Sequence, residues 1–129
     1  MSKAVFDTRF FIEHYYSEDN KILQKTREII RATRQRYIST IVIHELYTLT
    51  LQKEGRETAE LRATLLEKDF KIINVNAQIA KTSAELRHKY KTSMADSIIA
   101  ATALTLKAPC VTDDHHIKNI KEIKTKWIL

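Results

Sequence analysis

Acidic residues follow two apolar segments that have the pattern of short buried strands. Asp7 comes directly after residues 3–6, and the run from Thr112 to Asp114 comes directly after residues 109–111. The carboxyl ends of parallel strands are where open α/β sheets bind their ligands. If the two strands are neighbours, these acids line one crevice. The alternative is that each acid only caps a helix or lies in a solvated turn, since Asp is favoured at helix N-caps.

Glu45 is a further candidate and lies in a helix predicted over residues 41–54. Val42, Leu46 and Leu49 form the buried stripe of this helix, and Glu45 lies about 60° from the centre of that stripe. Its side chain is therefore expected at the edge of the core. Taken alone, a helical Glu is more often a solvated surface residue.

Asp96 lies in the first turn of a helix predicted over residues 94–107. Ser93 and Asp96 have the spacing of a capping box, which would explain the acid without any function. The helix is apolar nearly all round, however, and such helices are normally buried. A buried carboxylate is costly unless it is paired or bound to a metal. The helix N-terminus favours the ionised form, which is the form that binds metal.

The four acidic positions together predict a metal site. Oxygen ligands from several carboxylates select a hard cation such as Mg²⁺ or Mn²⁺. Without a cation, close carboxylates would repel one another. Two ions about 4 Å apart can activate water, hold a scissile phosphate and stabilise its leaving oxygen. The predicted chemistry is therefore hydrolysis of a phosphodiester.

The charge of the chain points to nucleic acid as the partner. A net charge of +6 and a pI near 9.5 favour association with polyanions. The charge is uneven, because residues 21–36 hold six basic residues against Glu28, and residues 118–129 hold four against Glu122. The alternative is a surface that is merely soluble. A basic surface around an acidic metal site suits a nuclease, in which Lys and Arg hold the phosphate backbone.

The composition limits the class of protein. At 129 residues the chain is expected to form a single domain over residues 1–129. Cys110 has no partner for a disulfide, no apolar run approaches the roughly 18 residues that span a membrane, and no signal peptide precedes the first strand. A cytoplasmic protein is therefore expected. His44, His115 and His116 lack the spacing of zinc ligands and are interpreted as surface or structural residues.

Strand-like and helix-like segments alternate along the chain. The expected strands are 3–7, 37–39, 70–75, 109–111 and a terminal edge strand over 126–129. The expected helices with both ends predicted are 8–16, 41–54, 56–68 and 94–107, and the apolar face of 56–68 consists of Leu61, Leu65 and Leu66. Two further helices are expected, one capped by Ser17 and ending near residue 34, and one capped by Asn76 and ending at residue 90. A short helical turn is expected through Ile117 and Ile120. This alternation predicts a parallel sheet covered on both faces, with right-handed crossovers.

With these residues in hand, the whole chain resembles a PIN-domain ribonuclease of the VapC toxin type. The resemblance rests on Val5-Phe6-Asp7-Thr8, Ile43-His44-Glu45-Leu46-Tyr47, Ala95-Asp96-Ser97-Ile98-Ile99-Ala100-Ala101-Thr102-Ala103-Leu104 and Val111-Thr112-Asp113-Asp114. The third segment is the most specific. The resemblance implies an α/β fold, a three-layer α/β/α PIN-like domain with a central parallel sheet of four to five strands. It also implies that the catalytic and metal-binding acids are Asp7, Glu45, Asp96 and Asp114.

The resemblance also assigns supporting residues around these acids. The fourth family acid lies two residues after the strand-end Thr112, which selects Asp114 and leaves Asp113 at a variable position. Thr112 would orient a bound water or the fourth acid, and Thr8 adjoins the first acid. Family members often carry a small hydroxyl residue or Asn where this chain has Arg9. A ligand role at that position is therefore doubtful, and Arg9 is a candidate for contact with substrate phosphate.

The implied activity is endonucleolytic cleavage of RNA with Mg²⁺ or Mn²⁺. The implied partners are an RNA substrate, a second copy of the chain in a homodimer, and a small antitoxin protein that inhibits the toxin. One alternative is a PIN-like protein that binds RNA without cutting it. Another is an α/β phosphatase of the haloacid-dehalogenase type, which needs a second Asp two residues after its nucleophile, where this chain has Arg9. A response-regulator receiver needs an acid after its middle strand, and Ile73-Asn74-Val75 offers none.

Overall fold

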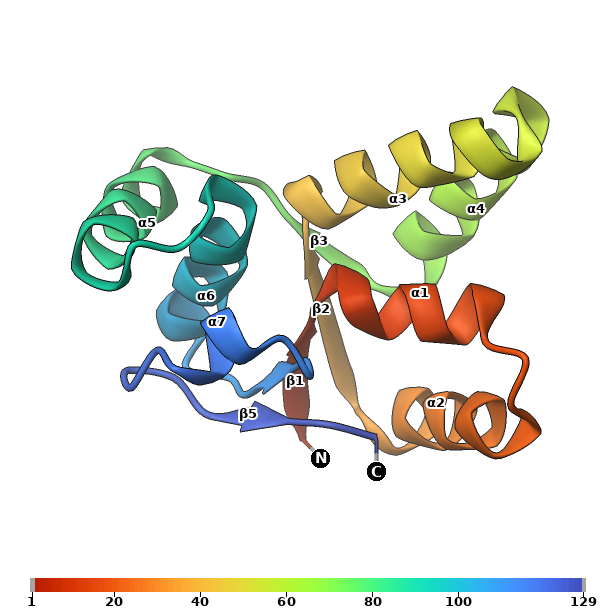
Figure 1. Cartoon of the computed structure of the whole chain (residues 1–129), viewed down its shortest axis with the longest axis horizontal. Helices are drawn as coiled ribbons and strands as arrows, with labels where there is room; N and C mark the ends of the chain where they lie inside the picture. The colour runs from red at the N-terminus through yellow and green to blue at the C-terminus, as the bar shows by residue number, and fades with distance from the viewer. Residues whose placement is uncertain (1, 129) are drawn as a thin grey trace.

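The computed structural model describes residues 2–128, and strands and helices alternate in it as the sequence predicts (Figure 1). The strands are β1 (Lys3–Phe6), β2 (Gln35–Ser39), β3 (Lys71–Ile73), β4 (Cys110–Val111) and β5 (Thr125–Lys126). The helices are α1 (Thr8–Tyr16), α2 (Asn20–Ala32), α3 (Thr40–Glu54), α4 (Arg56–Asp69), α5 (Ala77–Tyr90), α6 (Met94–Leu106) and α7 (His115–Lys118).

The five strands form one parallel sheet in the order β3-β2-β1-β4-β5. β1 is the central strand. The chain adds β2 and then β3 on one side of β1, and later adds β4 and then β5 on the other side. The strand order therefore reverses between β1 and β4, which is the position where such sheets bind ligands. Phe6 pairs with Val111 at the carboxyl ends of these two strands. The expected neighbourhood of the two acid-bearing strands is confirmed.

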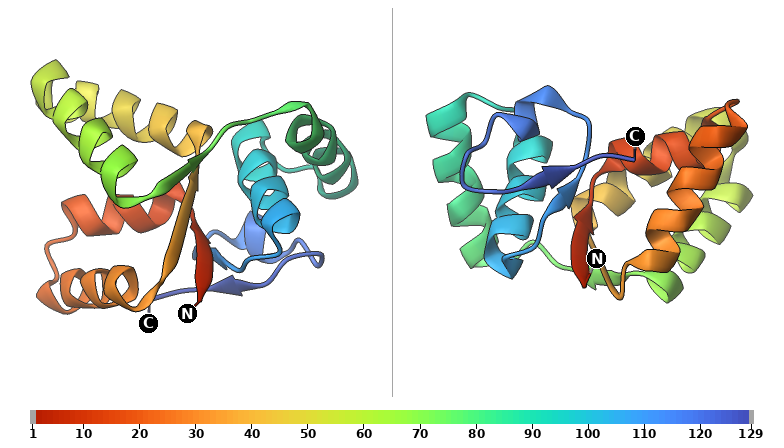
Figure 2. Two further views of the ribbon diagram at one scale, coloured as in Figure 1. Left: turned by 180° about the vertical axis from the view of Figure 1, so that it is seen from behind. Right: turned by 90° about the horizontal axis from the view of Figure 1, so that it is seen from below.

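Helices cover both faces of the sheet and give the three-layer α/β/α architecture that was predicted. α1 to α4 lie on one side of the sheet and α5 to α7 on the other (Figures 1 and 2). On the first side, the rings of Phe6, Phe10, Phe11 and Phe70 pack mainly edge to face, a favoured geometry for aromatic pairs. On the second side, α6 is buried from Ser97 to Ala103, as its apolar sequence predicts.

A polar cluster ties α1, α3 and α4 together and so fixes the position of the helix that carries Glu45. The guanidinium of Arg62 lies 4.5 Å from the ring centre of Tyr15 and forms an ion pair with Glu54. Arg62 also donates to the hydroxyl of Tyr16, which itself donates to Glu54 over 2.7 Å. One side chain from α4 therefore contacts the ends of both α1 and α3.

Some local expectations were wrong. Ser17 does not cap α2; the carboxylate of Asp19 does, by accepting the N–H of Lys21, and the Ser17 hydroxyl accepts the N–H of Asp19 instead. α2 ends at Ala32 rather than near 34, and the third strand is confined to Lys71–Ile73. The terminal strand is Thr125–Lys126, at the sheet edge as expected, and position 129 of the predicted strand lies outside the described residues.

The buried face of α4 also differs from the expectation. Leu66 is buried, but Leu61 and Leu65 are 59% and 46% exposed, and Ala59 takes the second buried position. α4 packs chiefly against α3 at the outer end of the molecule (Figure 1). Neighbouring elements bury only a narrow stripe of α4 there. The buried face of three leucines that was predicted from their spacing is therefore wider than the observed one. Over residues 2–128, no helix combines the length and the apolarity that a membrane crossing requires.

Candidate active site

Asp7 lies at the point where the sheet order reverses. It occupies the N-cap position of α1, but its side chain makes no capping hydrogen bond there. Instead, its Oδ2 accepts a hydrogen bond of 2.6 Å from the hydroxyl of Thr112, which follows β4. The residue is only 3% exposed. The capping interpretation of Asp7 is therefore wrong, and its carboxylate is held between the ends of the two strands.

The environment of Asp7 disfavours its charged form. Burial raises the pKa of Asp7 from 3.8 to about 7, and the hydrogen bonds from Thr112 and from the backbone of Thr8 only partly offset this increase. The negative charges of Asp96 and Asp114 contribute smaller parts of the same increase. These charges act on Asp7 because three of the predicted acids lie around the same strand ends.

Asp96 and Glu45 reach this region from helices on opposite faces of the sheet. Asp96 is half-buried in the first turn of α6, and its N–H donates to the hydroxyl of Ser93 over 3.1 Å. Burial raises the pKa of Asp96, and the charges of Asp114 and Glu45 raise it further. Glu45 is half-buried on α3, at the edge of the core as predicted, and its Oε1 accepts a 2.6 Å bond from the hydroxyl of Thr8.

Asp114 caps the short helix α7. Its Oδ1 accepts the backbone N–H groups of His116 at 2.8 Å and Ile117 at 3.3 Å. Its own N–H donates to the hydroxyl of Thr112 over 3.0 Å. The Thr112 hydroxyl therefore bridges the first and fourth acids, donating to the carboxylate of Asp7 and accepting from the backbone of Asp114. The expectation named the fourth acid as its partner but did not foresee the bond to the first.

Asp113 forms an ion pair with Arg9. Two bonds, from Nε at 3.1 Å and from Nη2 at 3.2 Å, join the guanidinium to the two carboxylate oxygens. The bonds to Asp113 raise the pKa of Arg9, and both side chains remain partly exposed. The pair connects the start of α1 to the loop after β4. Its members were supporting candidates in the sequence, but their pairing across 104 positions was not predicted.

The donor set fits a hard divalent ion, although the side chains are not gathered into a finished coordination sphere. Within residues 2–128, no group of three or more His, Cys, Asp or Glu is arranged to hold a metal. Glu45 is turned to Thr8, and one oxygen of Asp114 is used by α7. Yet no ion pair in this part of the chain includes any of the four acids. A cation would neutralise a cluster of carboxylates that now raise one another's pKa.

A groove begins at this site and continues along α1 and α3. It has a volume of about 410 Å³ and is lined by Thr8, Ile12, His44, Glu45, Thr48, Leu49 and Gln52. His44, interpreted from sequence as a surface residue, is exposed and adjoins Glu45 on this groove wall. The helical spacing of His44, Thr48 and Gln52 could have indicated a shared face. His115 and His116 are exposed next to the acids, with ring centres 4.1 Å apart.

Fold and site together define a three-layer α/β domain in which acids lie close to one another at the point where the strand order reverses. The model of the PIN domain family matches residues 4–123, and the chain belongs to this family. No curated protein matches the sequence. The resemblance predicted from the sequence motifs is therefore confirmed at the level of the family.

Solved structures of toxin–antitoxin systems share the fold. VapBC from Salmonella typhimurium bound to DNA aligns with a TM-score of 0.80 at 17% identity over 100% of both chains. VapBC2 from Rickettsia felis, bound to a DNA fragment of its promoter, aligns with a TM-score of 0.78 at 18% identity, over 97% of this chain and 98% of that one. VapC20 from Mycobacterium tuberculosis, a toxin that cleaves the Sarcin-Ricin loop, aligns with a TM-score of 0.73 at 15% identity, over 94% of this chain and 98% of that one.

Proposed function

We propose that this chain is a metal-dependent endoribonuclease and the toxin of a VapBC-type toxin–antitoxin pair. The observation that carries the proposal is the buried carboxylate of Asp7, which lies at the reversal of strand order, beside two further acids and without a cationic partner in residues 2–128. Membership of the PIN domain family and the fold shared with VapBC toxins support a nuclease.

Asp7, Glu45, Asp96 and Asp114 would hold Mg²⁺ or Mn²⁺. When bound, such an ion supplies Lewis-acid activation of water and neutralises charge on the scissile phosphate. The hydroxyl of Thr112 fixes the orientation of Asp7, and the hydroxyl of Thr8 holds the carboxylate of Glu45. Such outer hydrogen bonds keep metal-binding carboxylates in place and tune their affinity.

Arg9 and Asp113 have a different part in this proposal. The ion pair keeps Asp113 from competing as a ligand and places a guanidinium beside the acids, where the charge of Asp7 also acts on it. A fixed guanidinium suits the recognition of a phosphate group, because its donors match phosphate geometry. Arg9 would therefore orient the RNA backbone at the site, and its position rules against a phosphatase that needs a second Asp there.

The partners follow from the same proposal. A small antitoxin would occupy the groove along α1 and α3, where Ile12 and Leu49 offer apolar surface next to Glu45. A homodimer and a cytoplasmic location remain predictions, and light scattering on the purified chain tests the first. The RNA substrate is tested by the experiment that follows.

The test compares cleavage of labelled RNA by the wild type and by Asp7→Asn and Asp96→Asn, each with Mn²⁺ and with a chelator. We expect both variants to lose cleavage while their circular-dichroism spectra stay unchanged. Glu85→Gln, which neutralises an exposed acid on α5, is the control and should cleave normally. Mn²⁺ should raise the melting temperature of the wild type and leave that of Asp7→Asn nearly unchanged.

Two results would contradict the proposal. Cleavage at the wild-type rate by either active-site variant would remove those carboxylates from the mechanism. RNA binding that ignores chelator, without cleavage and without stabilisation by Mn²⁺, would favour an RNA-binding protein with an inactive site.

A further inference from the structure

A second cleft lies at the opposite end of the sheet from the acids. It has a volume of about 360 Å³ and is lined by Arg34, Gln35, Arg36, Tyr37, Lys68, Asp69, Phe70 and Lys71. These residues come from the start of β2 and from the junction of α4 with β3. In the view from behind, the start of β2 lies below the end of α4 (Figure 2, left). Three of the five residues of β2 line the cleft. Its near edge at Tyr37 is therefore roughly 7 Å of strand from the carboxyl end of β2, and its far edge at Gln35 roughly 13 Å.

The cleft is strongly basic, and within residues 2–128 no ion pair neutralises its charges. It contains four cationic side chains and one carboxylate, Asp69. None of them takes part in an ion pair with another residue between positions 2 and 128. Arg34, Lys68 and Lys71 are exposed. A concave surface with an excess of positive charge attracts and concentrates polyanions.

Arg36 has a different role from the three exposed cations. Its Nη1 donates to the carbonyl of Ile30 over 3.2 Å, and its guanidinium lies 5.8 Å from the ring centre of Phe70. It is therefore held against the floor of the cleft as a fixed positive charge. The three exposed side chains can adjust around it, which suits the flexible backbone of a polynucleotide.

The aromatic residues favour nucleic acid over an acidic polypeptide. Tyr37 is half-buried beside the cations, and its hydroxyl donates to Gln35 over 3.4 Å. Proteins that bind single-stranded nucleic acid combine a positive groove with aromatic side chains on which bases stack. An acidic peptide would use the cations but would gain little from the ring of Tyr37.

We propose that this cleft, formed by Arg34, Arg36, Tyr37, Lys68 and Lys71, is a second binding site for the RNA substrate that holds phosphates distant from the cleavage position. The inference rests on the proposed ribonuclease function and adds to it. RNA bound at both ends of the sheet must extend well beyond the scissile bond. Long or structured RNA is then preferred over short oligonucleotides, because only the former reaches the cleft.

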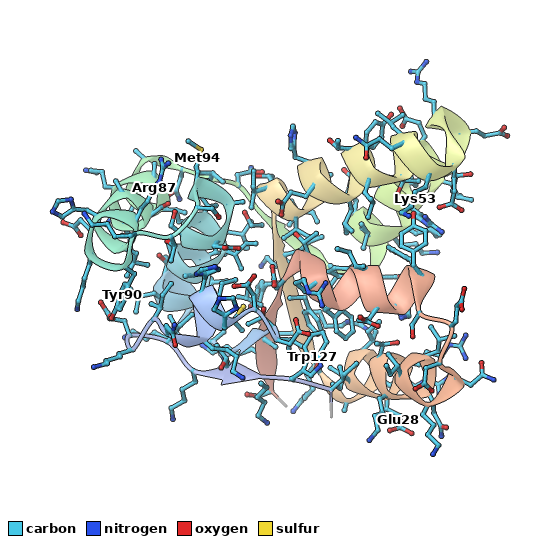
Figure 3. The ribbon with its side chains drawn as sticks, viewed as in Figure 1. Glu28, Lys53, Arg87, Tyr90, Met94 and Trp127 are labelled. Carbon is cyan, nitrogen blue, oxygen red and sulfur yellow. The ribbon has the colours of Figure 1, made fainter. Side chains whose placement is uncertain are left out.

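The test replaces the three exposed cations together, as Arg34→Gln, Lys68→Gln and Lys71→Gln. Arg36 is left in place because it binds the backbone of Ile30. The control replaces Lys81, Arg87 and Lys121 with Gln, which removes the same charge from α5 and from the loop after α7. Arg87 projects from α5 on the other side of the sheet from α4 (Figure 3).

The primary measurement is the affinity for a fluorescein-labelled single-stranded RNA of about 20 nucleotides, in chelator and over a range of salt concentrations. Each phosphate contact in single-stranded nucleic acid contributes about 0.7 to the slope of log affinity against log salt. The triple cleft variant should lose about 2 from this slope and bind about tenfold more weakly, while the control keeps most of both. Cleavage of a tetranucleotide should be unchanged in the cleft variant, and cleavage of the long RNA should fall.

A measurement on the unaltered protein guards against misfolding of the variant. Acetylation of Lys68 and Lys71, followed by mass spectrometry, should be suppressed by the RNA, and acetylation of Lys81 should not. Protection of all three lysines to the same extent would overturn the proposal. So would a salt slope in the cleft variant equal to that of the control.

The outcomes also separate this inference from the proposed function. If the wild type cleaves RNA but the cleft variant binds like the control, the cleft is excluded and the nuclease stands. If the wild type binds RNA through the cleft without cutting it, the nuclease fails and the cleft stands. If a polyglutamate peptide binds the wild type but not the cleft variant, and RNA affinity is equal in both, the cleft binds an acidic protein segment and the inference is wrong.

Discussion

Replacing Asp7 with Asn should stabilise the metal-free protein at neutral pH. Burial, together with the charges of Asp96 and Asp114, raises the pKa of Asp7 from 3.8 to about 7. In the unfolded chain the carboxyl group returns to its ordinary pKa. Between these two values the folded protein binds more protons than the unfolded chain, so the free energy of unfolding falls as the pH rises. A shift of about three units corresponds to roughly 4 kcal/mol, lost once the pH exceeds about 7.

The assay is urea unfolding of the wild type and of Asp7→Asn in chelator, at about pH 4.5 and about pH 7.5. The Asn side chain can still accept the hydroxyl of Thr112, so the substitution removes mainly the charge. At about pH 4.5 the two proteins should differ by no more than roughly 1 kcal/mol. At about pH 7.5 the Asn variant should be more stable by roughly 2–4 kcal/mol, the lower figure allowing for an amide that lacks a partner.

Saturating Mn²⁺ should reverse the order of stability. An ion present at about a thousand times its Kd for the folded wild type stabilises that protein by about 4.1 kcal/mol, which exceeds the expected difference, and the Asn variant gains little. The reasoning would be refuted if Asp7→Asn were equally or less stable than the wild type at both pH values in chelator. That result would mean that the buried carboxylate is already compensated within the chain.

Three further predictions concern single side chains. Thr112→Val keeps the shape of the residue but removes its bond to the carboxylate, and should lower the free energy of unfolding at neutral pH by about 2 kcal/mol in urea titrations. Arg9→Gln breaks an exposed ion pair and should change the free energy of unfolding by less than about 1 kcal/mol, yet it should lower the rate of RNA cleavage. Asp113→Asn breaks the same pair but should keep most of the cleavage rate. Equal losses of cleavage in the two variants would contradict the separate roles given to Arg9 and Asp113. Leu66→Ala should cost about 2–5 kcal/mol because the residue is buried, while Leu61→Gln should stay within about 0.5 kcal/mol; similar costs in thermal melts would show that the exposed face of α4 is covered in solution.

The sequence predicted those features that depend on residues close to one another along the chain. An apolar run followed by an acid predicts a strand that ends at that acid. This prediction is confirmed for Asp7 and for the run that begins at Thr112, which follow the neighbouring strands β1 and β4. The continuous apolar character of α6 predicted a helix buried on all sides, and it is buried from Ser97 to Ala103. Short-range signals such as the caps at Asn76 and Ser93 were also sufficient.

Contacts between distant segments could not be predicted in the same way. The bond between Asp7 and Thr112 joins residues 105 positions apart, and the pair of Arg9 with Asp113 spans 104. Neither follows from spacing, because both depend on which strands become neighbours in the sheet. The exposure of Leu61 could not be predicted either, because it also depends on the tertiary arrangement. The periodicity of α4 predicts a neighbouring element against Leu61, but α4 lies at the outer end of the molecule and has no such neighbour there. Whether the four acids form one metal site remains a prediction for the same reason.

The edges of the sheet have a consequence for how the protein associates with other chains. The outermost strands, β3 and β5, have three and two residues, and each carries a lysine, Lys71 and Lys126. Short, positively charged edges offer few free backbone groups to an incoming strand. Association by strand addition is therefore disfavoured, and the molecule should stay free of edge-to-edge aggregation at high concentration. A partner would have to bind through helices and grooves, so binding and inhibition would be decided by side chains rather than by backbone pairing.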